Sequence, residues 1–161
     1  MHAAWMLALW LIGSADKPPM ASMARVRPTR GAEMILLDAA ARSATVRDLL
    51  DRIAASDVIV YVELTAPAQV PIARTKLVAA TPAARFLRVG INVALPMHDW
   101  AALLGHELQH AVEIAEHPDV RDDEGVRRLY ASIGHQYGID NYETGAAVTI
   151  ERRVREELRH H

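Results

Sequence analysis

Alternating apolar and polar residues in the middle of the chain predict a small β-sheet. Residues 58–64 are β-branched and almost wholly apolar, which is typical of a buried strand. Residues 74–80 form a candidate second strand. Residues 85–93 alternate regularly, with aliphatic side chains on one face and arginine, glycine and asparagine on the other. We expect residues 85–93 to lie at the edge of a three-stranded sheet, either as a plain edge or as a strand that pairs with an extended ligand.

Helical spacing of apolar residues predicts helices before and after this sheet. The predicted helices cover residues 31–43, 45–54, 99–116, 124–134 and 142–159. The second of them begins at Thr45, which reads as an N-cap with the carboxylate of Asp48 three residues further on. Two helices, three strands and three further helices, in this order, indicate an α+β fold with segregated elements.

The most informative segment is the helix predicted over residues 99–116. Asp99 places negative charge in its first turn. Its apolar side chains form one stripe, which consists of Leu104, Leu108, Ala111, Val112 and Ala115. His106 and His110 project roughly opposite, with Glu107 between them in the sequence. The helix would bury its stripe and offer its histidines to something else; two ordinary solvated histidines are the competing interpretation.

Two imidazoles four residues apart lie on one face of a helix, so both can hold a single metal ion. A carboxylate between them can act on water bound to that metal, which is the HExxH pattern of zinc-dependent peptidases. Catalytic zinc usually takes three protein ligands and one water. The chain has no cysteine, so the third ligand must be histidine, aspartate or glutamate.

Three residues are candidates for this third ligand. Glu113 shares the face of His106 but lies about 10 Å further along an unbent helix. His117 would need a sharp turn for which the sequence supplies no glycine. Glu143 falls on the apolar stripe of the helix predicted over 142–159, where a carboxylate costs free energy unless it is paired or bound to metal. We favour Glu143; a first-turn glutamate stabilised by the helix dipole is the alternative.

The HExxH motif together with the downstream Glu143 resembles the gluzincin group of metallopeptidases, in which the third ligand is a glutamate on a separate helix after the motif. The resemblance includes small bacterial proteins of this type and extends over residues 58–158. It is carried by the segments 103–115, 129–134 and 142–144. It implies a minimal zincin-like fold, one Zn²⁺ ion and a peptide or protein substrate.

The resemblance also implies roles for individual residues. His106, His110 and Glu143 would bind zinc, and Glu107 would take a proton from water and deliver it to the leaving amine. In many gluzincins an acidic residue four positions after the glutamate ligand orients the first histidine. Here that position is Ala147, so the residue that orients the histidine is left open.

The donor that stabilises the developing oxyanion is also left open. Tyr130, His135, Tyr137 and Tyr142 are the candidates, and Tyr130 lies on the apolar stripe of its helix, where packing is its simplest role. A catalytically inactive metal-binding or scaffolding protein of the same fold is therefore the alternative to a peptidase.

Composition limits the remaining possibilities. The chain has 161 residues, 51% of them hydrophobic, which suits one domain with a core. Its net charge of −2 gives no electrostatic case for nucleic acid. Residues 1–15 fit a signal peptide or a hydrophobic arm too short to span a membrane, 16–30 a linker, and 31–161 a metallopeptidase-like domain. If residues 1–15 are a signal peptide, we expect the protein to be exported to the periplasm or the exterior. If they are not, we expect it to be cytoplasmic.

Overall fold

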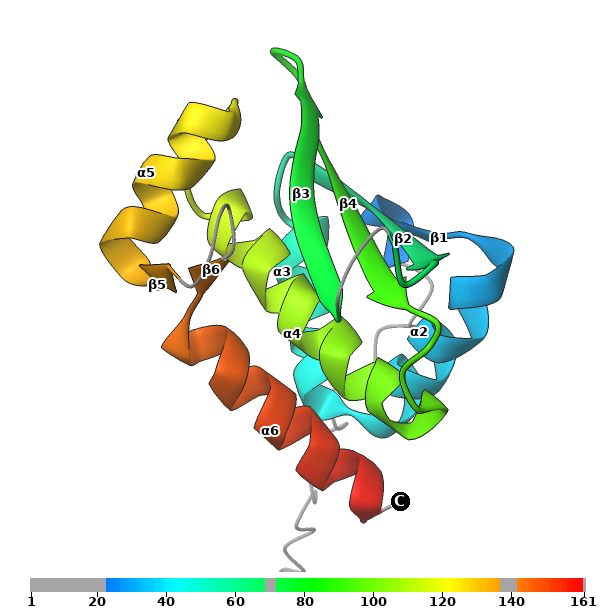
Figure 1. The fold of residues 1–161 in the computed structure, drawn as a ribbon. Helices are drawn as coiled ribbons and strands as arrows, with labels where there is room; N and C mark the ends of the chain where they lie inside the picture. Colours follow the sequence, from blue (N-terminus) through cyan, green and yellow to red (C-terminus); the bar gives the residue numbers. More distant parts are fainter. Residues whose placement is uncertain (1–22, 69–71, 137–141, 161) are drawn as a thin grey trace, which may run out of the picture.

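Figure 1 shows the computed structural model of the chain, which describes residues 23–68, 72–136 and 142–160. The described residues form an α+β fold, as the sequence predicts. A short 3₁₀ helix, η1, comes first, over Met23–Arg25. The helices are α2 (Arg30–Arg42), α3 (Ala44–Ala54), α4 (Met97–Ala115), α5 (Asp123–Ile133) and α6 (Gly145–Arg159). The strands are β1 (Val26–Pro28), β2 (Val58–Thr65), β3 (Ala73–Ala80), β4 (Arg85–Asn92), β5 (His135–Gln136) and β6 (Tyr142–Glu143).

The main sheet has four strands in the order β1-β2-β4-β3, one more than the sequence predicts. Strands β1, β2 and β4 run parallel, and β3 is antiparallel to β4. The added strand β1 lies within the predicted linker 16–30, where Val26 is buried and pairs with Val60. A three-residue strand has too little sequence for a period-two signal, so only its pairing defines it. Residues 1–15 lie outside the described residues.

The edge strands are β1 and β3, and the prediction that residues 85–93 form an edge is wrong. Strand β4 pairs with β2 on one side and with β3 on the other. Its alternation reports that one face of the sheet is buried and the other is solvated, which is equally true of an interior strand in an open sheet. Leu87, Val89 and Ile91 are fully buried, whereas Arg88 on the opposite face is exposed.

Helices cover one face of the sheet. Helices α2, α3 and α4 contact the strands, and α6 packs against α4 (Figure 1). None of the described helices is long and apolar enough to cross a membrane. The short β5–β6 hairpin joins α5 to α6.

The observed helices begin one to three residues away from the predicted starts, and for α3 and α6 the difference involves the residue that caps the helix. The N-cap of α3 is Ser43, whose hydroxyl accepts the Val46 amide at 3.0 Å. Thr45, the predicted cap, instead donates its hydroxyl to Glu157 Oε1 on α6 at 2.8 Å. Helix α6 begins after Thr144, which caps it, so the helix predicted from residue 142 starts three residues late.

The C-terminal end of α4 is held by a buried arginine that the sequence analysis missed. The side chain of Arg85, at the start of β4, is fully buried. Its Nη2 lies 2.6 Å from Asp57 Oδ1, and its Nη1 donates to the carbonyls of Ile114 and His117 at 2.6 and 2.7 Å. Both carbonyl oxygens also accept a backbone amide, from His117 and Val120 respectively. The guanidinium therefore adds a charged donor at the negative end of the helix dipole, and it fixes α4 against the sheet.

Candidate metal centre

Helix α4 is enclosed on nearly all sides, more than its apolar stripe predicts. The stripe is buried except for Ala115, which is half-buried. The polar residues Glu107, Gln109, His110 and Glu113 are buried too. The His106 and His110 side chains are 12% and 8% exposed. The alternative of ordinary solvated histidines is therefore wrong. Buried polar groups need partners, and each of these side chains has one.

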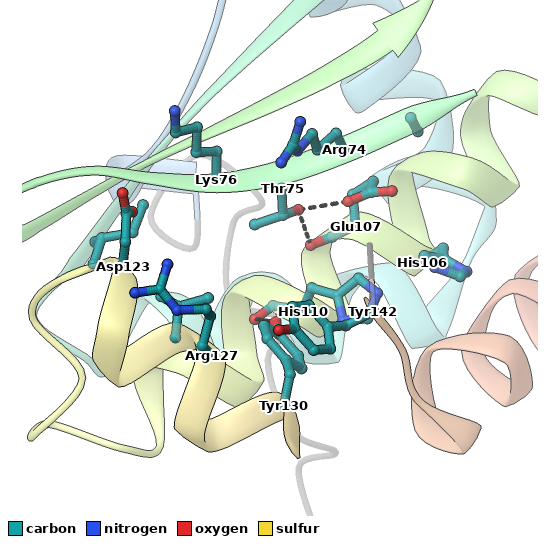
Figure 2. A pocket seen from close by; sticks show the side chains of 13 residues that line it. Arg74, Thr75, Lys76, His106, Glu107, His110, Asp123, Arg127, Tyr130 and Tyr142 are labelled. Carbon is teal, nitrogen blue, oxygen red and sulfur yellow. Dashed lines mark hydrogen bonds between the residues drawn. The ribbon is translucent and has the colours of Figure 1, made fainter. Parts of the chain in front are cut away.

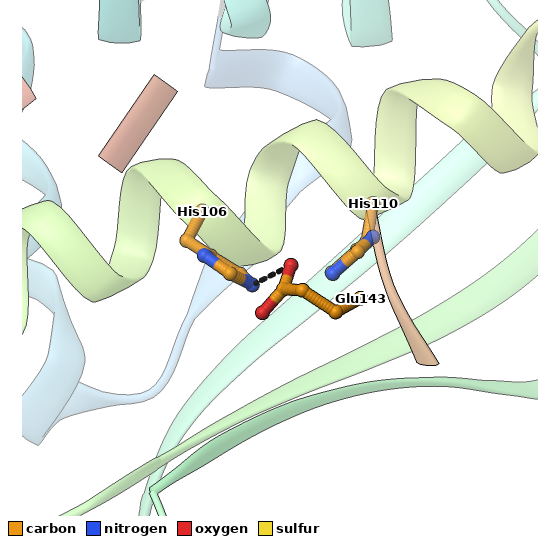
Figure 3. A group of neighbouring side chains, drawn as sticks. All are labelled: His106, His110 and Glu143. Atoms are coloured by element: carbon orange, nitrogen blue, oxygen red, sulfur yellow. Dashed lines mark ion pairs between the residues drawn. The ribbon is translucent and has the colours of Figure 1, made fainter. Parts of the chain in front are cut away.

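The structure brings His106, His110 and Glu143 together (Figure 3). One ligand atom from each residue lies within 4.8 Å of the other two, and His106 Nε2 is 3.4 Å from Glu143 Oε1. Ligands about 2.0–2.1 Å from a tetrahedral zinc ion are about 3.4 Å from one another. Two imidazoles and one carboxylate are also the donor types that catalytic zinc takes, so the residues fit this ion.

Glu143 reaches the histidines from β6, not from a helix as predicted. In the β5–β6 pairing it lies opposite His135. The backbone amide of Thr144 donates to Glu143 Oε1 at 3.0 Å, which orients the carboxylate. A Cβ atom at Gly134 would come within 2.7 Å of the Glu143 carbonyl oxygen, so a glycine is needed for the end of α5 to approach β6 this closely.

Glu113 and His117, the other candidates for third ligand, make different contacts. The Glu113 carboxylate lies 2.8 Å from His110 Nδ1 and accepts the Thr144 hydroxyl at 2.7 Å. The Nδ1 of His117 lies 2.8 Å from the Glu113 carbonyl oxygen. Glu113 therefore orients His110 and leaves its Nε2 toward Glu143, while His117 takes no part in the cluster.

Glu151 on α6 plays the corresponding role for His106. Its Oε2 lies 3.1 Å from His106 Nδ1, and its Oε1 accepts from Arg155 at 2.8 Å. Arg155 in turn bonds Asp99 at the start of α4. The gluzincin pattern predicts this acidic residue at position 147, where the chain has alanine. Helix α6 carries it one turn later, because α6 begins only after Glu143.

Burial and hydrogen bonding set opposing influences on these groups. Burial alone lowers the pKa of His110, but the hydrogen bond to Glu113 and the nearby carboxylates raise it above its ordinary value. Burial raises the pKa of Glu113, but hydrogen bonds from His110 and Thr144 outweigh it and leave that pKa lowered. The pair therefore favours a charged Glu113 that accepts the His110 Nδ1–H, the tautomer that a metal ligand requires.

Glu107 points from α4 toward strand β3. Thr75 donates its hydroxyl to Glu107 Oε2 at 2.6 Å (Figure 2). The residue is only 5% exposed, and this burial raises the pKa of its carboxyl group above the usual value. A carboxylate with a raised pKa is a better proton acceptor near neutral pH.

A pocket opens beside Glu107 and the histidines, between β3 and α5. Tyr130 and Tyr142 line it with stacked rings, 5.5 Å between centroids. The Tyr130 hydroxyl donates to the His110 carbonyl at 3.3 Å. His135 is exposed and does not line the pocket, and Tyr137 lies outside the described residues. Of the four oxyanion-donor candidates, the structure places Tyr130 and Tyr142 at the site.

Comparison of the chain with family models, curated proteins and solved structures finds no match. Only the residues of the site therefore indicate a function.

Proposed function

We propose that this protein is a zinc-dependent peptidase of the gluzincin type. The observation that carries the proposal is the convergence of His106, His110 and Glu143, from two separate segments, beside the buried carboxylate of Glu107 at the wall of a pocket. The imidazoles are also oriented in the way that metal-binding histidines are. Here both Nδ1 atoms have carboxylate partners.

A zinc ion bound by these residues would supply Lewis acidity and lower the pKa of water in the site. Glu107 would accept a proton from that water and pass it to the leaving nitrogen. Its raised pKa suits both steps, and the Thr75 hydroxyl holds the carboxylate facing the pocket. Tyr130 and Tyr142 are the side chains available to bond the carbonyl oxygen of a substrate.

Strand β3 is the element that would hold the substrate. It has one strand partner among the described residues, β4, and its other edge borders the pocket. An extended peptide added at that edge gains backbone hydrogen bonds whatever its side chains. The role that we expected of residues 85–93 thus passes to residues 73–80.

The alternative function, metal binding without hydrolysis, is favoured by one observation. The Tyr130 hydroxyl already donates to the His110 carbonyl, so it would have to leave that bond to serve an oxyanion. Such a protein would bind zinc through the same residues and show no turnover.

The deciding experiment compares Glu107→Gln and Glu143→Ala with the unaltered protein. Zinc content is measured by elemental analysis, and hydrolysis of a fluorogenic peptide library is measured with and without chelator. We expect Glu107→Gln to keep about one zinc per chain and to lose activity by roughly 10²–10⁴-fold, since it removes only the base. Glu143→Ala should lose zinc and activity together.

Glu33→Gln is the matched control, because Glu33 is an exposed glutamate in the first turn of α2. It should change neither zinc content nor turnover. Full zinc occupancy with no hydrolysis of any peptide would favour the metal-binding alternative. Absence of zinc from the unaltered protein would contradict both functions.

A further inference from the structure

The solvated face of the main sheet carries a row of exposed side chains across all four strands, with cations on β1, β4 and β3 and a tyrosine on β2. The pairing registers place Arg27 of β1 beside Tyr61 of β2, Tyr61 beside Arg88 of β4, and Arg88 beside Lys76 of β3. Arg27 donates to the Tyr61 hydroxyl at 3.1 Å. Neighbouring strands are about 4.8 Å apart, so the row is continuous. It stands out in a chain whose net charge is −2.

Two members of this row oppose each other. Arg88 and Lys76 are directly paired across β4 and β3, both exposed, and like charges in this arrangement destabilise a sheet. Glu63 lies 3.6 Å from Arg88 and partly offsets its charge. No ion pair links Lys76 to any carboxylate among the described residues. An unfavourable pair of this kind is relieved when an anion lies beside it.

The row ends at the strand that borders the pocket. Residues of β3 alternate, so that Thr75 points to Glu107 while Arg74 and Lys76 lie on the other side of the strand (Figure 2). A peptide strand added at this edge would continue the row. Every second side chain of the peptide would stand about 5 Å from Lys76 or Arg74, and the others would enter the pocket.

We propose that the pocket and the free edge of β3 bind extended peptides with acidic side chains at alternate positions. Lys76, with the neighbouring charge of Arg88, selects these peptides. The inference rests on the proposed function for catalysis, but selection at β3 requires only that a peptide binds there. Arg74 lies on the same face two residues away and would meet a second acidic side chain.

The test measures binding separately from cleavage, with zinc-loaded Glu107→Gln protein. Three fluorescent peptides share one sequence except that two positions, i and i+2, are both glutamate, both glutamine or both lysine. We expect the glutamate peptide to bind about tenfold more tightly than the glutamine peptide at low salt, and the difference to shrink at high salt. The lysine peptide should bind most weakly.

Charge reversal at Lys76 is the decisive variant. In a Lys76→Glu background the order of the glutamate and lysine peptides should invert. Arg152→Glu, an exposed charge reversal on α6, is the matched control and should preserve the original order. Circular dichroism of both variants checks that the fold is retained.

Equal binding of the three peptides, or a Lys76→Glu variant with the original order, would overturn the selection of acidic peptides. The proposal would also be overturned if single-stranded DNA or anionic vesicles bound through Lys76 without displacing the bound glutamate peptide. Either result would leave the proposed peptidase function intact if the unaltered protein still cleaves peptides. If the unaltered protein cleaved no peptide but the glutamate peptide still bound most tightly, only the proposed peptidase function would be contradicted.

Discussion

The two histidines of the candidate site are held by carboxylates from different elements. Glu113 on α4 bonds His110, and Glu151 on α6 bonds His106. Each bond fixes the rotation of an imidazole ring and keeps its proton on Nδ1, so that Nε2 is ready to bind before any metal arrives. The site is therefore organised by the packing of α6 on α4, not by the HExxH motif alone.

Replacing Glu151 by alanine should weaken zinc binding about 10–100-fold, which is the usual effect of losing such a partner. Competition with a fluorescent zinc chelator measures the affinity directly and does not depend on turnover. Glu151→Gln should restore much of the affinity, because its amide oxygen can still accept the His106 Nδ1–H.

Glu156→Ala, an exposed residue on the same helix, provides the comparison and should bind zinc as tightly as the unaltered protein. If Glu151→Ala bound zinc with unchanged affinity, Glu151 would have no positioning role. If the Glu151→Gln protein bound zinc as weakly as the Glu151→Ala protein, Glu151 would act through its negative charge and not by orienting His106.

For single residues, the sequence predicts the site residues that lie close together on one helix. It does not predict all of those that only folding brings to the site. His106, Glu107 and His110 follow from a five-residue spacing on one helix. Glu143 follows from its place on the apolar stripe predicted for residues 142–159, although the structure puts it on β6, just before that helix. Glu151 could not be identified, because its position depends on where α6 begins, and Thr144 sets that point through a cap.

The contact between α4 and α6 is made close by Gly105, which immediately precedes the motif. A Cβ atom at this position would lie 2.8 Å from Val154 Cγ2 on α6. Valine is stiff in a helix and cannot turn away easily. What looks in the sequence like a weak point of the helix is thus the place where the second helix approaches.

Gly105→Ala should therefore destabilise the protein by about 1–3 kcal/mol, despite the better helix propensity of alanine, because the added methyl group overpacks the contact. Chemical denaturation measures the change. It should be accompanied by weaker zinc binding, since α6 carries Glu151. The double variant Gly105→Ala/Val154→Ala should recover part of the helix contact, although the cavity at position 154 has its own cost.

Gly145→Ala is the control for helix propensity, because a Cβ atom at Gly145 meets nothing within 4 Å. It should be neutral or stabilising by up to about 1 kcal/mol. A Gly105→Ala protein as stable as Gly145→Ala would show that the two helices can separate without loss.

The sequence predicts which segments are helices and strands, but it does not predict which neighbours each of them has in the fold. The helices over 99–116 and 124–134 appear with ends shifted by one or two residues. Strand β4 has the predicted alternation but lies inside the sheet. Period-two alternation shows which face is buried, whereas the position of a strand in the sheet is decided by the strands that pair with it, here β2 and β3.

Over the whole molecule, two acidic residues join segments that are far apart in sequence. Asp57 pairs with Arg85 beside the end of α4, and Glu157 on α6 accepts the hydroxyls of Ser43 and Thr45 at the start of α3. The hydrogen bond from Arg85 lowers the pKa of Asp57. Burial raises the pKa of Glu157, but the bonds from Ser43 and Thr45 outweigh it and lower that pKa.

These lowered pKa values make the fold acid-sensitive. A carboxylate whose folded pKa lies below its unfolded value, about 4, contributes stability that is complete above that value. The contribution is lost as the pH falls from about 4 through the folded pKa. We expect the free energy of unfolding of the metal-free protein, measured in urea with a chelator present, to fall below about pH 4 for this reason.

Asp57→Asn tests the ion pair between Asp57 and Arg85 on its own. It leaves the Arg85 guanidinium without its carboxylate, and at pH 7 it should cost about 1–3 kcal/mol, less than for a wholly buried pair because the Asp57 side chain is 29% exposed. The difference from the unaltered protein should narrow as the pH falls, since protonated Asp57 has already lost its charge. Asp119→Asn, at an exposed position near the end of α4, should follow the unaltered protein at every pH. A difference for Asp57→Asn that stayed constant from pH 7 to pH 3 would mean that the ion pair does not tie α4 to the sheet, and that the hydrogen bonds of Arg85 to the helix carbonyls suffice.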